Sequence, residues 1–340
     1  MKRFFVILLA LSVALLAACG SGTQQAQGSK TQLIITHYQP GTPDQPKQAA
    51  ALAFQAYVER ATHGSIEVQI YPNSELGDGP AVLQAMQAGT IQMTIVHDGP
   101  VSALYPPMGV YNMPFLFESH AEAWTIYDGP YGQKLGEAMR QETGLRLLGF
   151  GENGIRHLTN SRRPITRLED VRGLTIRIQP SPIYDALILG LGANATAVAW
   201  TELPAALQQG VADGQENSIT NILAAQLYET QRYATLDGHV YSYHVYLIDD
   251  NFWNSLTPEQ QTAIQEGVDI AKWVHRGMTA YQDNTAKAVL QSYGVQVSEL
   301  SPQELARFRA AAQPAVVDWM NRTYGGTWVQ ELLDEVSKLR

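Results

Sequence analysis

The chain has 340 residues, of which 32 are acidic and 23 are basic, so its formal net charge at pH 7 is −9. The acidic residues are spread without long runs, which makes nucleic acid an unsuitable partner, because surfaces that bind nucleic acid are basic. Cys19 is the only cysteine, so neither a disulfide nor a thiolate metal site can stabilise the body of the protein. The remaining body of roughly 310 residues is long enough for two ordinary domains.

The N-terminus has the pattern of an export signal. Lys2 and Arg3 precede an uncharged apolar stretch at residues 4–16, which is followed by Ala17, Ala18 and Cys19. The stretch is too short to span a bilayer, so residues 1–18 are predicted to be a cleaved signal peptide. The sequence around Cys19 looks like a lipoprotein box, which implies a lipidated Cys19 and a flexible tether at residues 19–30. We therefore expect an extracytoplasmic, lipid-anchored protein; an ordinary signal peptide with an incidental cysteine is the alternative.

The first part of the body alternates strand and helix patterns. Strands are expected near residues 33–35, 66–70 and 91–96. Between them, the spacing predicts one helix with Ala51, Phe54, Val58 and Ala61 on a single face, and a shorter helix that Asp78 caps. This order is typical of a parallel sheet covered by helices.

The same alternation begins again in the middle of the chain. It predicts strands at residues 174–178 and 195–199, and helices at 182–191 and 201–209. A repeated unit of this kind indicates two α/β domains with a cleft between them.

The last hundred residues read as mostly helical. Thr257, Pro258 and Gln260 form a capping-box pattern, and the helix that follows is expected to run to about residue 290. Such a helix would be about 45 to 50 Å long, which is longer than one small domain. We therefore expect domain I to comprise residues 31–152 plus about 242–281 and domain II residues 153–241 plus about 282–340, with the helix at about 258–290 shared between them.

Six segments, taken together, resemble the extracytoplasmic solute receptors of TRAP transporters, the DctP-like family. They are residues 71–77 (YPNSELG), 112–117 (NMPFLF), 173–177 (GLTIR), 213–217 (DGQEN), 238–242 (GHVYS) and 252–256 (FWNSL). The resemblance implies an α/β, two-domain fold like that of periplasmic binding proteins, with a ligand cleft and a long bracing helix. It also implies a receptor that delivers a small organic acid to a membrane permease driven by an ion gradient.

The resemblance also implies which residues contact the ligand. Arg177 corresponds to the arginine that holds the ligand carboxylate, and Asn217 usually completes the site. Arg156 matches a second basic position, and Trp200 matches an aromatic position. The remaining candidates are Tyr38, Glu75, His97 and Asp98; of these, Tyr38, His97 and Asp98 lie in or beside loops that vary with the substrate.

Physical chemistry supports the role of Arg177. An arginine near the C-terminal end of an inner strand points into the crevice where open α/β sheets bind ligands. Its planar guanidinium can grip a carboxylate with two charge-assisted hydrogen bonds. A C4-dicarboxylate or a sugar acid suits this site best, and a 2-oxo or 2-hydroxy acid also fits.

Other functions receive less support from the sequence. Gly149, Gly151 and Gly154 have dinucleotide-fingerprint spacing, but the residues that follow read as a strand, whereas pyrophosphate binding requires a helix N-terminus. A nucleophile elbow and a zinc-protease motif are absent, and Asp213 and Glu216 are better suited to turns or to orienting an arginine than to acid/base catalysis. We expect neither an enzyme nor a cofactor or metal; a receptor for an ATP-driven importer, a sensor and an extracytoplasmic enzyme acting on organic acids stay as alternatives.

Overall fold

The computed structural model describes residues 30–340, so the predicted signal peptide and Cys19 lie outside the described residues. The strands are β1 Thr31–His37, β2 Ile66–Tyr71, β3 Met93–His97, β4 Leu145–Asn160, β5 Thr175–Ile178, β6 Asn194–Ala197, β7 Gly214–Ser218, β8 Tyr233–Asp249 and β9 Gln296–Glu299. The α-helices are α1 Pro46–Ala61, α2 Gly79–Gln87, α3 Asp98–Leu104, α4 His120–Asp128, α5 Pro130–Thr143, α6 Pro182–Gly190, α7 Leu203–Gln208, α8 Ile219–Ala224, α9 Asp250–Ser255, α10 Pro258–Ser292, α11 Pro302–Tyr324 and α12 Gly326–Ser337. Short 3-10 helices are η1 Pro106–Asn112, η2 Leu168–Val171, η3 Trp200–Glu202 and η4 Leu227–Glu229.

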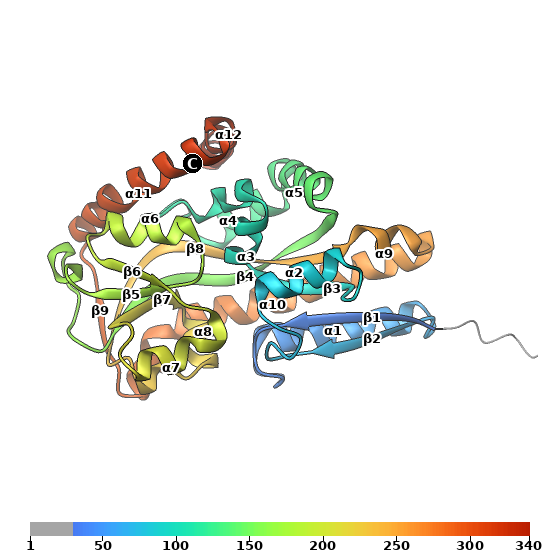
Figure 1. The fold of residues 1–340 in the computed structure, drawn as a ribbon, viewed down its shortest axis with the longest axis horizontal. Helices are drawn as coiled ribbons and strands as arrows, with labels where there is room; N and C mark the ends of the chain where they lie inside the picture. Colours follow the sequence, from blue (N-terminus) through green and yellow to red (C-terminus); the bar gives the residue numbers. More distant parts are fainter. Residues whose placement is uncertain (1–29) are drawn as a thin grey trace, which may run out of the picture.

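The strands form a mixed sheet with helices packed around it (Figure 1). Its order is β2-β1-β3-β8-β4-β7-β5-β6, and β9 pairs with β8. The pairs β1 with β2, β1 with β3, β5 with β6 and β5 with β7 are parallel, as the alternating strand and helix patterns predict. Where β8 meets β3 and β4, and where β4 meets β7, the pairing is antiparallel.

Two long antiparallel strands, β4 and β8, join the two ends of the sheet. We call the part that contains β1, β2 and β3, with its helices, lobe I, and the part that contains β5, β6, β7 and β9 lobe II. The last half of β8 pairs with β3 in lobe I, the first half of β4 pairs with that half of β8, and the other halves of both strands reach lobe II. The pairing of β4 with β8 shifts register at three places, and the shift between Glu152 and Gly154 is a bulge between the lobes.

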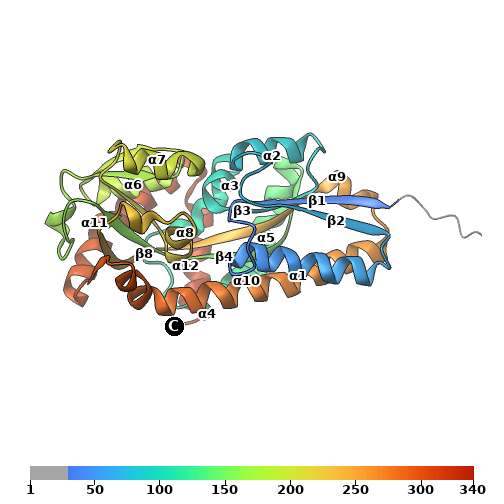
Figure 2. The same cartoon turned by 90° about the horizontal axis from the view of Figure 1, so that it is seen from below.

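Helix α10 runs along both lobes (Figure 2). Its 35 residues correspond to about 52 Å at the usual rise of an α-helix. Ile264 and Val268 pack in the core of lobe I with Phe54 of α1, whereas Ala286 and Leu290 pack in the core of lobe II. The long bracing helix expected from the sequence is therefore present, and Thr257 caps it through a capping box.

The sequence placed most short elements within a few residues of their observed bounds. Phe54 and Val58 are buried on α1, but Ala61, expected on the same face, is exposed at the end of the helix. The helix expected at 201–209 begins as η3 and continues as α7. The sequence did not reveal the 16- and 17-residue strands β4 and β8, because polar residues and glycines interrupt their alternation. In the described part of the chain, no helix is long and apolar enough to cross a membrane.

A group of titratable side chains is buried beside the bulge in β4. Glu152 accepts hydrogen bonds from Trp124 Nε1 at 2.6 Å and from Tyr241, and it pairs with His120 Nδ1 at 2.6 Å. Asp283 of α10 accepts a hydrogen bond from the backbone N–H of Ile155 at 3.0 Å. Its carboxylate lies so close to Gly154 that a Cβ there would meet both oxygens within 3.0 Å.

Burial raises the pKa of Asp283 to about 8, and the neighbouring Glu152 adds to the shift. The unfolded chain releases this proton near pH 4, whereas the folded protein holds it until about pH 8. Asp283 therefore destabilises the folded state progressively as the pH rises through this interval.

We predict that Asp283→Asn changes the free energy of unfolding more favourably at pH 8 than at pH 4.5, by at least about 1 kcal/mol. Asparagine can still accept the Ile155 hydrogen bond, but it carries no charge. Thermal unfolding of both proteins from pH 4.5 to pH 9 measures the difference, and Asp318→Asn, at an exposed position of α11, is the control. A difference that does not change with pH would contradict the prediction.

Candidate functional site

A small cavity of about 20 Å³ lies between the two lobes. It is lined by Tyr38, Lys47 and His97 from lobe I, by Asn153 and Arg156 from β4, and by Arg177, Gln179, Trp200, Asn217 and Asn221 from lobe II. Six of the eight predicted ligand contacts are among these residues: Arg177, Asn217, Arg156, Trp200, His97 and Tyr38. Six residues that the sequence analysis singled out are therefore brought together around one cavity.

The parallel strands explain why these side chains meet. His97 is the last residue of β3, Tyr38 directly follows β1, and Lys47 lies in the first turn of α1. Tyr38 and His97 are thus at the C-terminal ends of two parallel strands, where open α/β sheets bind ligands. On the other wall, Arg177 of β5 pairs in register with Gln215 of β7. Arg156 of β4 pairs in register with Ser218 of β7, so three adjacent strands bring Arg156, Asn217 and Arg177 together.

Arg177 is buried, with only 1% of its surface exposed. Its Nε and Nη2 atoms both donate to the carbonyl oxygen of Val198, at 2.9 and 2.7 Å. No carboxylate of the described residues lies within ion-pair distance of its guanidinium. Burial lowers the pKa of Arg177 to about 9, Glu216 opposes the shift and Arg156 adds to it. A buried guanidinium in this state is poised to bind an anion.

Arg156 differs from Arg177 because it already has an acid partner. Its Nε and Nη2 donate to the two carboxylate oxygens of Glu216 at 2.5 and 2.7 Å, and Nη2 also donates to the Glu216 carbonyl at 2.9 Å. Its guanidinium lies 4.7 Å from the centre of the Tyr184 ring. Burial opposes ionisation of Glu216, but Arg156 and His239 outweigh it and lower the pKa of Glu216. Arg156 therefore lines the cavity as one half of a neutral pair.

His239 and Asp237 extend this pair away from the cavity. His239 Nε2 lies 3.2 Å from Glu216, and its Nδ1 lies 2.9 Å from Asp237. Burial alone would lower the pKa of His239, yet the two carboxylates raise it to about 9. Glu216 is thus held between two cations, which fits the sequence-based expectation that it orients an arginine.

Lys47 is the cavity residue that the sequence analysis missed. It is 2% exposed, and its Nζ has no hydrogen bond or ion pair to the described residues; the nearest aromatic ring, that of Tyr38, has its centre 5.6 Å away. Burial lowers its pKa to about 7, although Asp98 opposes the shift. The sequence contained a pattern that could have identified it. The helix dipole disfavours a lysine in the first turn of a helix, so a lysine at this position is a candidate for a binding role.

Tyr38 and His97 lie next to each other on the lobe I side of the cavity. Their rings meet edge to face with centres 5.2 Å apart, and the Tyr38 hydroxyl is buried without a hydrogen-bond partner in the described residues. Burial lowers the pKa of His97 well below its usual value, and the charges of Lys47, Arg156 and Arg177 lower it further. His97 is therefore neutral and can offer both a donor and an acceptor.

Amide side chains supply the neutral polar groups of the cavity. Asn217 Oδ1 accepts hydrogen bonds from Ser218 N at 3.0 Å and from Asn221 Nδ2 at 2.8 Å, so its own Nδ2 is left to donate elsewhere. Asn153 Oδ1 accepts from Asn221 Nδ2 at 2.7 Å, and Asn153 Nδ2 donates to Ser242 at 2.7 Å. Trp200, at the start of η3, is half-buried and packs against the core of lobe II and against a second hydrophobic cluster.

Two sequence-based expectations are corrected. Asp98 does not line the cavity, and its carboxylate accepts hydrogen bonds from Asn112, from Tyr184 at 2.5 Å, from Gln179 at 3.0 Å and from Ser242 at 3.1 Å. Glu75 is exposed in the turn that follows β2 and is also absent from the lining. Asp98 instead ties α3 of lobe I to α6 of lobe II and to β8.

Among the described residues, one group of His, Asp and Glu side chains is close enough to hold a metal ion. It consists of His120, Glu152 and Asp283, whose candidate ligand atoms lie within 4.8 Å of one another. These are the residues beside the bulge in β4, and none of them lines the cavity between the lobes. Both Glu152 oxygens accept hydrogen bonds from neighbouring side chains.

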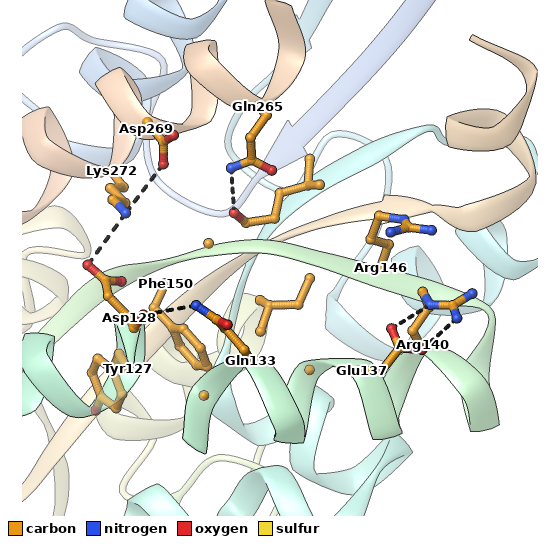
Figure 3. A pocket seen from close by; sticks show the side chains of 15 residues that line it. Tyr127, Asp128, Gln133, Glu137, Arg140, Arg146, Phe150, Gln265, Asp269 and Lys272 are labelled. Atoms are coloured by element: carbon orange, nitrogen blue, oxygen red, sulfur yellow. Dashed lines mark hydrogen bonds and ion pairs between the residues drawn. The ribbon is translucent and has the colours of Figure 1, made fainter. Parts of the chain in front are cut away.

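A larger hollow of about 300 Å³ lies between α5, the start of β4 and α10 (Figure 3). Its charged side chains neutralise one another: Arg140 pairs with Glu137 and Asp250, and Lys272 lies between Asp128 and Asp269. No lining cation is left buried without an acid partner, in contrast to the cavity between the lobes. The smaller cavity is therefore the better candidate for binding an acid.

The Arg156–Glu216 pair yields a stability prediction. Removing one member of a buried ion pair leaves the other charge unpaired, so Glu216→Gln should lower the free energy of unfolding by about 3 kcal/mol. Thermal and denaturant unfolding measure the loss. Glu335→Gln, which removes the exposed pair with Lys338, is the control and should cost less than about 1 kcal/mol. Equal losses in the two variants would contradict the prediction.

Comparison with known proteins agrees with this geometry. Residues 37–323 match the family model described as DctP, bacterial extracellular solute-binding protein, family 7. A 2,3-diketo-L-gulonate-binding periplasmic protein of Escherichia coli is 30% identical over 288 residues, which cover 85% of this chain and 86% of the relative.

Two crystal structures are also similar. The sugar acid binding protein DctPAm of Advenella mimigardefordensis, in complex with galactonate, has a TM-score of 0.87 and 30% identity over 92% of this chain and 99% of that one. A TRAP periplasmic solute-binding protein of a Polaromonas species, bound to D-erythronate, has a TM-score of 0.83 and 30% identity over 89% and 98% of the two chains. The family consists of extracytoplasmic receptors that bind organic acids. The chain belongs to the DctP family of bacterial extracellular solute-binding proteins.

Proposed function

We propose that the protein is the receptor of a TRAP-type transporter, and that it holds the carboxylate of a small organic acid on Arg177. The observation that carries this proposal is a buried guanidinium with no carboxylate partner among the described residues, in a cavity between two lobes. A ligand carboxylate can accept two parallel hydrogen bonds from a guanidinium, each contributing about 1.5 to 3 kcal/mol.

The site supports binding and release more than catalysis. No nucleophile is paired with a base among the lining residues, whose polar groups are arginines, amides, a neutral histidine, a lysine, a tyrosine hydroxyl and a tryptophan N–H. The similar proteins bind galactonate, D-erythronate and 2,3-diketo-L-gulonate. All three ligands are carboxylates with further oxygen atoms, which suits the amide groups of Asn153, Asn217 and Asn221.

Three further parts of the proposal rest on the sequence. The partner would be a membrane permease of two multi-spanning subunits driven by an ion gradient. A neighbouring gene for an ATPase would instead favour an ATP-driven importer. A neighbouring gene for a signalling protein would favour a sensor. Cys19 would carry the lipid anchor after removal of residues 1–18. The domain boundaries near residues 152, 241 and 281 would mark the points about which the lobes move.

The Arg177 contact can be tested by substitution. We predict that Arg177→Lys binds galactonate, or any acid found in a thermal-shift screen, at least about 100-fold more weakly, because an ammonium cannot reproduce the paired hydrogen bonds. Isothermal titration calorimetry measures the dissociation constants. Arg322→Lys, at an exposed position of α11, should leave the affinity unchanged. Unaltered binding by Arg177→Lys would show that another group holds the acid.

The size of the cavity leads to a prediction about shape. A cavity of about 20 Å³ has room for about one water molecule, so an acid of several carbons can enter only if the lobes separate. Closing without an acid buries Arg177 and Lys47 unpaired, which is unfavourable. We therefore expect small-angle scattering to show a larger radius of gyration without ligand than with a saturating acid. Arg177→Lys at the same acid concentration should stay expanded, and superimposable profiles of the native protein would contradict the prediction.

A further inference from the structure

The cavity contains a second buried cation that has no acid partner. Lys47 lies on the lobe I wall and Arg177 on the lobe II wall, and both line the same small space. Within the described residues, Lys47 Nζ has no ion pair, and the lysine is almost as fully buried as Arg177. A lysine gains nothing structural from burial in this state, since desolvation of an ammonium is costly unless an anion compensates it.

The other cations around the cavity already have a partner or are neutral. Arg156 is neutralised by Glu216, and His97 is neutral because burial and the surrounding cations lower its pKa. Asp98 acts on Lys47 from a distance, but it forms no ion pair with Lys47, and its oxygens accept hydrogen bonds from Tyr184, Gln179 and Ser242. Lys47 and Arg177, on opposite walls, therefore lack a directly bound anion that a ligand can supply.

The remaining lining residues indicate what lies between the two charges. Asn217 has a free Nδ2 donor, and Asn153 and Asn221 form an amide network beside it. Amides of this kind exchange hydrogen bonds with hydroxyl groups, which both donate and accept. The cavity thus offers a cation at each wall and neutral polar groups between them.

We propose that Lys47 binds a second carboxylate, so that the preferred ligand is a hydroxylated dicarboxylic acid that bridges Arg177 and Lys47. This inference rests on the proposed binding of an acid by Arg177 and adds the class of acid. An acid with one carboxylate neutralises only one wall, and lobe closure then leaves Lys47 desolvated and uncompensated. An acid with two carboxylates joins the walls through charge, which also favours closure.

Proton exchange on binding provides an independent readout. Burial in the closed cavity lowers the pKa of Lys47 to about 7, so at pH 8 closure around an acid with one carboxylate releases much of its proton, whereas a second carboxylate holds it in the charged form. The surrounding groups that lie near its charge are Asp98, His37, His97, His244 and His275. The four histidines have pKa values below their usual range and stay neutral at pH 8. Calorimetry in buffers of different ionisation enthalpy should therefore detect proton release with the monoacid and little with the diacid.

The experiment compares acids that differ in one end group. Galactonate and galactarate, and the four-carbon pair threonate and tartrate, are titrated into the native protein, Lys47→Met and Lys47→Arg. For the pair that binds, the native protein should prefer the diacid at least about tenfold. Lys47→Met, which keeps the length and apolar character of the side chain, should abolish that preference and the proton release. Lys47→Arg should keep the preference, and thermal unfolding checks that each variant is folded.

The outcomes separate this inference from the proposed function. A ratio of the two dissociation constants that is the same in the native protein and in Lys47→Met would overturn the role of Lys47, as would a native preference for the monoacid. If Lys47 has no role but the native protein binds an acid that Arg177→Lys does not bind, the proposed function of Arg177 is retained. If no acid binds the native protein at all, both proposals fall together.

Discussion

The burial of Arg177 without an acid partner is the constraint on which the site depends. In a medium of low polarity, a guanidinium is costly unless an anion compensates it. The two hydrogen bonds to the Val198 carbonyl orient the group but do not neutralise it. A carboxylate that enters the cavity therefore contributes in two ways. It forms hydrogen bonds with the guanidinium, and it removes the free-energy cost of burying that charge unpaired in the closed protein. Affinity and closure have the same physical origin.

The fold makes that cost depend on the relative position of the lobes. Arg177 belongs to lobe II and Lys47 to lobe I, while β4, β8 and α10 pass through both. The bulge between Glu152 and Gly154 interrupts the pairing of β4 with β8 between the lobes. Asp283 of α10 contacts the same point through the N–H of Ile155. The pairing is thus interrupted between the lobes, while β4, β8 and α10 continue through both.

The sequence predicted the fold class, the long helix and six of the ten lining residues for physical reasons that are local. Alternation marks the short buried strands, the Thr257 capping box marks the start of α10, and a strand-end arginine marks the crevice. Long-range pairing was beyond that reasoning. The register of β4 on β8 joins residues some ninety positions apart, as in the pairing of Gly151 with His244, and no local pattern specifies it. Asp98 was misjudged for the same cause, since its partners Gln179 and Tyr184 belong to the opposite lobe.

The two arginines show why residue type and position do not by themselves assign a role. Arg156 and Arg177 are both buried, both lie on strands beside β7, and both line the cavity. They differ in their contact with Glu216. Arg156 donates hydrogen bonds from two nitrogens to the Glu216 carboxylate, whereas Arg177 interacts with that carboxylate only electrostatically, without a hydrogen bond. A single glutamate therefore converts one arginine into a structural cation and leaves the other available to a ligand. The same reasoning applied to Lys47, which no carboxylate of the described residues reaches, makes it the second group available for binding.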